Sequence, residues 1–182
     1  LIAVSLMTNY FYRIKNLTDV LRKKGEAPVL YGGVHPTVKP YESIKHADYI
    51  CVGEGEEAIF DLVNSLGSPD AYAIPNIWCH KGSDIITNNV RPLVDNLDKY
   101  SFQDYDFTDH YVLHNNRVVK MDEGLLQMYL PRSDERNGPG VEYHISSSRN
   151  CPYNCTFCCN NAYRKLYARK GPYVRYRSVE NV

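Results

Sequence analysis

Residues Val29 to Thr37 read VLYGGVHPT and are the clearest indication of the fold. Its first three residues are apolar and predict a buried strand, which Gly32 and Gly33 bring to an end. A short helix, interrupted by proline, is predicted from Pro36 to His46. A strand followed by a helix is the repeating unit of a parallel sheet, so this stretch favours an α/β fold.

The same alternation extends to both sides. Apolar runs predict strands at Ile2–Met7 and Tyr49–Val52, and helices are predicted at Asn9–Lys24 and Glu54–Leu66. This order predicts a doubly wound parallel sheet of the Rossmann-like type. Such a sheet usually has about five strands and three are visible, so we expect its front strands to precede Leu1.

Each of the two long helices is predicted to bury one face, because its apolar residues recur at spacings of three and four. The predicted positions are Tyr10, Ile14, Leu17 and Leu21 in the first helix, and Ala58, Ile59, Leu62, Val63 and Leu66 in the second.

A turn cluster, Gly67-Ser68-Pro69-Asp70, is predicted to end the sheet segment. Hairpins are predicted at 76–87 and 111–120, joined by an ordered linker without periodicity. A further strand is predicted at Val141–Ser147. The chain therefore divides into segments 1–68, 69–138 and 139–182.

The composition argues against several classes of function. The chain has 182 residues, of which 43% are hydrophobic, and its 21 basic residues balance its 21 acidic ones. Without a basic excess we expect no nucleic-acid partner. No apolar run is long enough to span a membrane, and no signal segment opens the sequence. We therefore expect a protein of the reducing cytoplasm, where clustered cysteines favour metal binding over disulfides.

Four of the six cysteines lie between residues 151 and 159, and Cys151, Cys155 and Cys158 have the spacing CxxxCxxC. Three thiolates on a short loop can ligate three irons of a cubane cluster, which leaves the fourth iron open to a substrate or cofactor. A zinc site with Cys159 or His144 as fourth ligand is the alternative. Zinc sites normally contain two spaced pairs, and the sequence has no second pair.

This loop resembles the signature of the radical S-adenosylmethionine superfamily, with the aromatic Phe157 directly before the last cysteine. Residues 175–182 are similar to the start of that family's first barrel helix. The resemblance implies that Cys151, Cys155 and Cys158 hold a 4Fe–4S cluster and that Phe157 packs beside the adenine of S-adenosylmethionine. It also implies that Val141–Ser147 is the first strand of a partial TIM-like barrel, with the cluster loop at its carboxyl end.

The chemistry of the family follows from the same resemblance. The reduced cluster cleaves S-adenosylmethionine to methionine and a 5′-deoxyadenosyl radical, which abstracts hydrogen from a small-molecule substrate. A flavodoxin or ferredoxin is the expected electron donor. Cys159 lies outside the signature and is predicted to be a packed small side chain. A barrel needs on the order of 200 residues, so we expect little or no turnover from this chain alone.

The front of the chain resembles the cobalamin-binding domain that precedes the barrel in one group of these enzymes. The resemblance is carried by residues that follow each predicted strand, namely 5–8, 32–37 and 52–56. Ser5 and Thr8 would meet the nucleotide tail of cobalamin, and Gly32 and Gly33 would let the backbone approach the cofactor. The family's D-x-H-x-x-G segment is absent from the sequence, and His35 is interpreted as a loop residue.

By this resemblance, 1–68 is the C-terminal part of a cobalamin-binding-like domain, 69–138 a linker with hairpins and 139–182 the start of a radical S-adenosylmethionine domain. Three functions stay open. The chain comes from a cobalamin-linked radical enzyme, such as a C-methyltransferase or an oxidative or cyclising enzyme; from a radical enzyme whose front sheet is structural; or from a non-catalytic zinc or iron–sulfur module.

Overall fold

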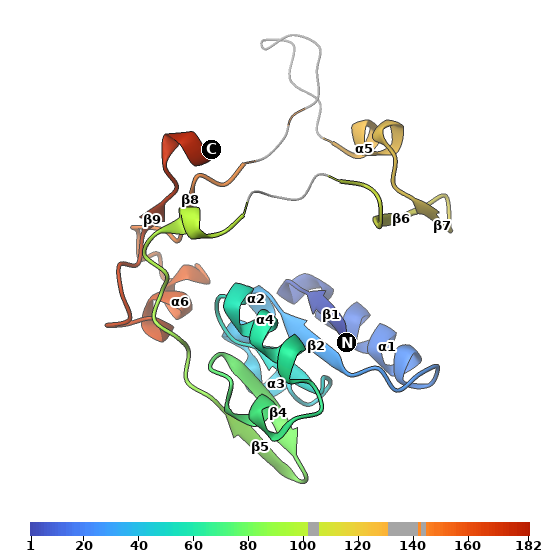
Figure 1. The fold of residues 1–182 in the computed structure, drawn as a ribbon, viewed down its shortest axis with the longest axis horizontal. Helices are drawn as coiled ribbons and strands as arrows, with labels where there is room; N and C mark the ends of the chain where they lie inside the picture. The colour runs from blue at the N-terminus through green and yellow to red at the C-terminus, as the bar shows by residue number, and fades with distance from the viewer. Residues whose placement is uncertain (102–105, 131–141, 143–144) are drawn as a thin grey trace. The chain divides into compact units, whose positions relative to one another are not determined.

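The computed structural model describes residues 1–101, 106–130, 142 and 145–182 (Figure 1). The chain forms two compact units. The first contains Leu1–Asp95 and Asn150–Val174, and the second contains Asn96–Arg149 and Arg175–Val182. Within the described ranges, no helix has both the length and the apolar character needed to cross a membrane.

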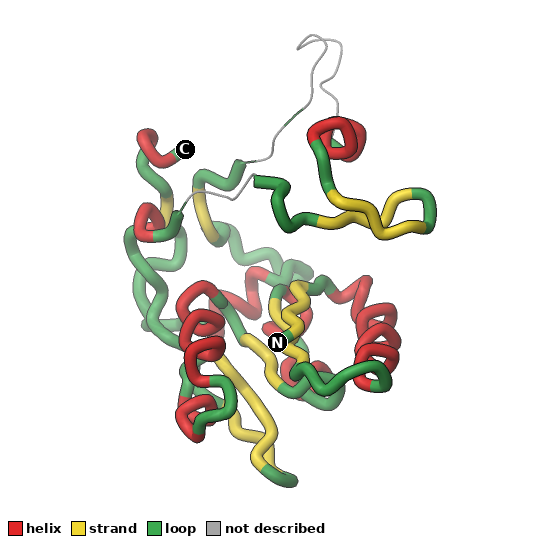
Figure 2. Tube along the Cα trace, turned by 45° about the vertical axis from the view of Figure 1, so that its right-hand side comes forward, coloured by secondary structure: helices red, strands yellow, loops and turns green. Residues whose placement is uncertain are grey.

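The first unit is built on a mixed sheet in which strands follow one another in chain order (Figure 2, yellow). Strands β1 (Ile2–Ser5), β2 (Val29–Gly32) and β3 (Tyr49–Cys51) are parallel, which confirms the predicted parallel arrangement. The first predicted hairpin is also confirmed, as β4 (Ile77–Lys81) and β5 (Asp84–Thr87). Because β4 pairs antiparallel with β3, the hairpin extends the sheet.

Helices cover both faces of this sheet. One core contains Val29 and Tyr31 of β2 and is covered by α1 (Phe11–Arg22) and by residues after α3 (Pro40–Ser43). The other contains Leu30 and is covered by α4 (Glu56–Ser65) and the 3-10 helix η2 (Pro69–Ala73). Alternate residues of a strand point to opposite faces, which is why the short run 29–31 supplies both cores. Helix α2 (Val34–Val38) follows β2 directly, and α6 (Asn160–Leu166) packs against α2.

The predicted buried face of the first helix is partly wrong. Tyr10 and Leu17 are exposed, while Phe11 and Thr18 are buried. A 3-10 turn, η1 (Thr8–Tyr10), precedes α1 and sets Phe11 toward the core. Thr18 can be buried because its hydroxyl donates to the Ile14 carbonyl oxygen, at 3.0 Å, and also bonds the hydroxyl of Tyr31. In α4, Ala58 and Leu62 are buried as predicted, but Val63 is exposed.

The second unit contains the second predicted hairpin, β6 (Tyr111–His114) and β7 (Arg117–Lys120). Asn115 and Asn116 form its turn with φ values of 48° and 62°, a conformation that asparagine tolerates well. The unit also contains α5 (Glu123–Tyr129), and the 3-10 helices η3 (Leu97–Lys99) and η4 (Val179–Asn181).

The strand predicted at Val141–Ser147 is not found where the structure describes this range. Residues 142 and 145–147 have no strand conformation, and residues 141, 143 and 144 lie outside the described part. A two-residue strand, β8 (Ser148–Arg149), follows and pairs antiparallel with β9 (Arg175–Tyr176). The strands of a TIM-like barrel are parallel, whereas β8 has an antiparallel partner.

Candidate functional site

The carboxyl ends of β1 and β2 are joined by backbone hydrogen bonds. The Leu6 N–H donates to the Gly32 carbonyl oxygen at 2.8 Å, and the His35 N–H donates to that of Leu6 at 3.1 Å. Gly33 lies between them with a φ of +94°, and a Cβ there would be 2.9 Å from the Leu6 backbone nitrogen. Gly33 is therefore required by the contact between two loops of the chain itself.

Gly32, in contrast, leaves open space. No atom lies within 4 Å of the position that a Cβ on Gly32 would take. Ser5 is the register partner of Gly32 and its side chain is exposed. Thr8 is also exposed, but its hydroxyl lies 3.2 Å from Nδ1 of His35. The four residues predicted to meet cobalamin thus gather at the carboxyl ends of β1 and β2, where a Cβ on Gly32 would meet no atom of a more distant residue and the side chain of Ser5 is exposed.

His35 holds this edge together, and the interpretation of it as a loop residue is wrong. It belongs to α2, is 2% exposed, and its ring centroid lies 4.1 Å from that of Phe11. Its Nε2 lies 4.0 Å from the carboxylate of Glu42. Burial lowers the pKa of His35, and Glu42 acts in the opposite direction. Buried against Phe11 and within hydrogen-bond distance of Thr8, His35 acts here as a packing residue.

Thr37 connects the loops that follow β2 and β3. Its hydroxyl donates to the Gly33 carbonyl oxygen at 2.8 Å and accepts from the Gly53 N–H at 3.0 Å. Thr37 belongs to α2, and α6 packs against this helix. One threonine therefore joins the two loops, and its helix lies against the segment that follows the cysteines.

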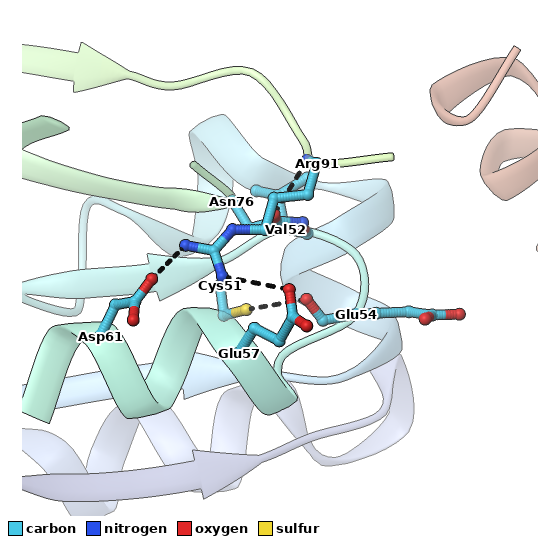
Figure 3. A network of polar contacts seen from close by, with 7 residues as sticks. All are labelled: Cys51, Val52, Glu54, Glu57, Asp61, Asn76 and Arg91. Carbon is cyan, nitrogen blue, oxygen red and sulfur yellow. Dashed lines mark hydrogen bonds and ion pairs between the residues drawn. The ribbon is translucent and has the colours of Figure 1, made fainter. Parts of the chain in front are cut away.

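Asn76 and Arg91 form a second set of contacts at the end of β3 (Figure 3). The buried Asn76 donates from Nδ2 to the Val52 carbonyl oxygen at 2.8 Å and accepts the Arg91 N–H at 3.0 Å. The Arg91 guanidinium pairs with Asp61 and, at 3.5 Å, with Glu57, both in α4. These contacts fix the segment around residue 91 onto α4.

The six cysteines separate into two kinds. Cys51 and Cys79 are buried inside the sheet, and burial raises the pKa of both thiols, that of Cys51 to about 12. These two thiols stay protonated, which makes them poor metal ligands. The remaining four, Cys151, Cys155, Cys158 and Cys159, lie on one loop, where Cys151 and Cys158 are half-buried and Cys155 is exposed.

The loop carries the right donors for an iron–sulfur cluster, but they are not gathered. In the part of the chain that the structure describes, no three His, Cys, Asp or Glu side chains form a group that could hold a metal ion. The donor set still fits by its chemistry: Cys151, Cys155 and Cys158 are free thiols that solvent reaches. A turn already joins two of them, since the Cys158 N–H donates to the Cys155 carbonyl oxygen at 3.1 Å.

Two neighbours of these thiols are exposed. Phe157, predicted to pack beside an adenine, is 92% exposed, so an apolar ring stands in solvent next to the candidate ligands. Cys159, predicted to be packed, is exposed as well, which corrects that expectation. It occupies the N-cap position of α6. His144, the other alternative zinc ligand, lies outside the described residues.

Helix α6 connects this loop to the end of β3. Tyr167 is 3% exposed, and its hydroxyl accepts the Glu54 N–H at 2.7 Å. Gly53 allows this approach, because a Cβ on it would lie 2.0 Å from the Tyr167 hydroxyl oxygen. Burial raises the pKa of Tyr167 to about 12, so the hydroxyl stays neutral. No pattern in the sequence predicts this contact, which joins residues 113 positions apart.

A mixed α/β unit with glycine-rich loops at the carboxyl ends of its parallel strands has the architecture of a nucleotide- or cofactor-binding domain. In agreement, residues 1–63 match the family model of the B12 binding domain.

Two methyltransferases are similar to most of the chain. The bacteriochlorophyllide d C-8(2)-methyltransferase of Chlorobaculum tepidum is 23% identical over 169 residues, which cover 92% of this chain and 30% of that protein. An uncharacterized methyltransferase of Pyrococcus horikoshii is 23% identical over 167 residues, which cover 88% of this chain and 31% of that protein. The chain thus spans a little under a third of the length of these relatives.

Proposed function

We propose that this chain is part of a cobalamin-dependent radical S-adenosylmethionine enzyme that acts as a methyltransferase. One observation carries the proposal: a loop with three free thiols spaced CxxxCxxC belongs to the same compact unit as a segment that matches the B12 binding domain. The similarity to two proteins named as methyltransferases favours methyl transfer over the oxidative and cyclising alternatives.

Each predicted residue has a role in this proposal. Cys151, Cys155 and Cys158 would hold a 4Fe–4S cluster with one open iron. The exposed ring of Phe157 would be covered by the adenine of S-adenosylmethionine. Around cobalamin, the open side of Gly32 would accept the bulk of the cofactor and Ser5 would offer its hydroxyl. Gly33 and Thr8 would act indirectly, since both already bind other loops of the chain.

When bound, the cluster would supply an electron to cleave S-adenosylmethionine, and cobalamin would supply a cobalt centre to carry a methyl group. The chain's own share is to hold three thiols on one loop and to attach the helix that follows them to the end of β3. The substrate would be a small molecule, and a flavodoxin or ferredoxin would deliver the electron. A reducing compartment such as the cytoplasm suits the free thiols. Residues from 139 onward would begin the radical domain.

The test is anaerobic reconstitution of the chain with iron and sulfide, followed by EPR spectroscopy of the reduced protein with and without S-adenosylmethionine. We expect a 4Fe–4S signal that changes when S-adenosylmethionine is added. Cys155→Ala should abolish it. Cys159→Ala is the matched control, because it removes an exposed thiol from the same loop and should leave the signal intact.

A signal that S-adenosylmethionine leaves unchanged would remove the open iron and favour an electron-transfer module. A zinc-loaded protein that takes up no iron would favour the structural module. Cobalamin is tested separately, by its absorption in the purified full-length protein. A protein with a responsive cluster that retains no cobalamin would be a radical enzyme with a structural front sheet.

A further inference from the structure

Arg164 of α6 makes contacts that the proposed function does not yet use. Its Nη2 donates to the carbonyl oxygens of Cys151 and Pro152, both at 2.9 Å, and lies 3.5 Å from that of Tyr153. These are three consecutive carbonyls, and the first belongs to the first cysteine of the loop. Backbone carbonyls outside regular structure have no helix or sheet partner, so an arginine that collects three of them fixes the path of the chain.

Tyr173 holds the guanidinium in place. The Arg164 guanidinium carbon lies 4.6 Å from the centre of the Tyr173 ring, a cation–π distance. The Tyr173 hydroxyl donates to the Asn160 carbonyl oxygen at 3.0 Å, and its own carbonyl accepts from Nδ2 of Asn150 at 2.8 Å. Asn150 directly precedes Cys151. The start of the cysteine loop is thus held from two sides.

The helix that carries Arg164 is itself attached to the sheet. Tyr167, three residues further on, accepts the Glu54 N–H. Lys170 donates from Nζ to the Val90 carbonyl oxygen, and its own carbonyl accepts the Leu93 N–H, both at 2.7 Å. Arg164 therefore acts from a fixed base.

The ordinary role for a basic residue near a helix C-terminus is to interact with the last carbonyls of its own helix. Arg164 lies in the last turn of α6, yet the carbonyls that it binds are in the cysteine loop. Lys165, next to it, has the same charge and is exposed. The position of the guanidinium on the loop therefore distinguishes Arg164 from its neighbour.

We propose that Arg164 is a positioning residue for the iron–sulfur cluster: it shapes the Cys151–Tyr153 backbone before iron binds and keeps a positive charge beside the cluster. This inference rests on the proposed function. The potential of an iron–sulfur cluster depends on nearby charge and hydrogen bonding. A fixed cation stabilises the reduced form, which carries one more negative charge.

The first experiment needs no iron. Hydrogen exchange is compared in the unloaded chain for wild type, Arg164→Gln, Arg164→Lys and Lys165→Gln. Arg164→Gln should speed exchange in residues 151–159 and leave β1 to β3 unchanged, while Lys165→Gln should match wild type. Unchanged exchange in Arg164→Gln would overturn the proposal. If that variant does not fold, judged by circular dichroism, Arg164→Lys decides, since it keeps the charge and loses the planar guanidinium that carries Nη2.

The second experiment uses the reconstituted chain. Losing a charge-assisted hydrogen bond corresponds to about ten- to a hundredfold in an equilibrium, so the affinity of Arg164→Gln for iron, measured against a chelator, should be lower by about tenfold or more. Its midpoint potential should also become more negative. Arg164→Lys should release iron faster while keeping a potential close to wild type. Equal effects from Lys165→Gln and Arg164→Gln would refute a positioning role. If wild type holds no cluster, the proposed function fails, and hydrogen exchange alone decides whether Arg164 holds the loop.

Discussion

Replacing Gly53 by alanine should destabilise the first unit more than the same change at a glycine whose new methyl group would meet no other atom. Gly53 has a φ of +87°, and a Cβ there would lie 2.0 Å from the Tyr167 hydroxyl oxygen and 2.9 Å from its Cζ. Left-handed backbone costs about 1–2 kcal/mol for a residue with a Cβ. Tyr167 must also retreat, which takes its hydroxyl away from the Glu54 N–H and costs about 1–3 kcal/mol. We expect a total of about 2–5 kcal/mol.

Gly67→Ala is the matched control. Gly67 has a φ of +83°, and no atom lies within 4 Å of the position of a Cβ there. Gly67→Ala should therefore cost only the backbone strain, about 1–2 kcal/mol. Urea unfolding followed by fluorescence measures both, because the protein has a single tryptophan, Trp78, in β4 of the same unit.

A double-mutant cycle separates the cost of the left-handed backbone from the cost of displacing Tyr167. Tyr167→Phe removes the oxygen nearest to the new methyl group, so Gly53→Ala should cost less in that background, by about 1 kcal/mol or more. Equal losses for Gly53→Ala and Gly67→Ala, or strict additivity with Tyr167→Phe, would show that the contact between α6 and the β3 loop is not formed.

Three further predictions follow from the site. Gly32→Ala should weaken cobalamin retention by the full-length protein, whereas Gly25→Ala, whose Cβ also meets no atom within 4 Å, should not; equal retention would contradict a role for the open side of Gly32. Burial lowers the pKa of His35 in the folded state, so the unfolded chain takes up the proton first and the free energy of unfolding falls as pH drops below about 6.5. His35→Asn should flatten that fall, and an unchanged pH profile would show that His35 is not the group responsible. Iodoacetamide at pH 8 should label cysteines of the 151–159 loop before Cys51, whose pKa is about 12, as mass spectrometry of digests can check; early labelling of Cys51 would mean that its burial is transient.

Local patterns predicted the parts of the fold that depend on local physics. The alternation of short apolar runs and helices gave the three parallel strands, and Asn115-Asn116 gave the hairpin turn, because both depend on neighbouring residues. Burial of Thr18 was not predictable, because its hydroxyl is satisfied by Tyr31, which belongs to another element.

In the candidate site, too, features set by neighbouring residues could be predicted and features set by packing between segments could not. The spacing of the cysteines is visible in the sequence, and so is the pair Gly32-Gly33. The different roles of these two glycines are not visible in the sequence. Gly33 is required because a Cβ there would clash with the backbone of Leu6, whereas a Cβ on Gly32 would contact no atom of a more distant residue. The burial of His35 against Phe11 and the docking of Tyr167 on Gly53 also arise from packing between segments, which periodicity does not report.

The contact between Tyr167 and Glu54 also sets an order of events during synthesis. Strands β1 to β5 leave the ribosome first, but the loop after β3 lacks its partner until Tyr167 emerges, 113 positions after Glu54. At about 5–20 residues per second, synthesis of these 113 residues takes about 6–23 s. A fragment that ends at residue 95 would contain every strand of the sheet and still lack the side chains that close its edge. A fragment made to study the sheet should therefore keep residues 150–174, which supply Tyr167.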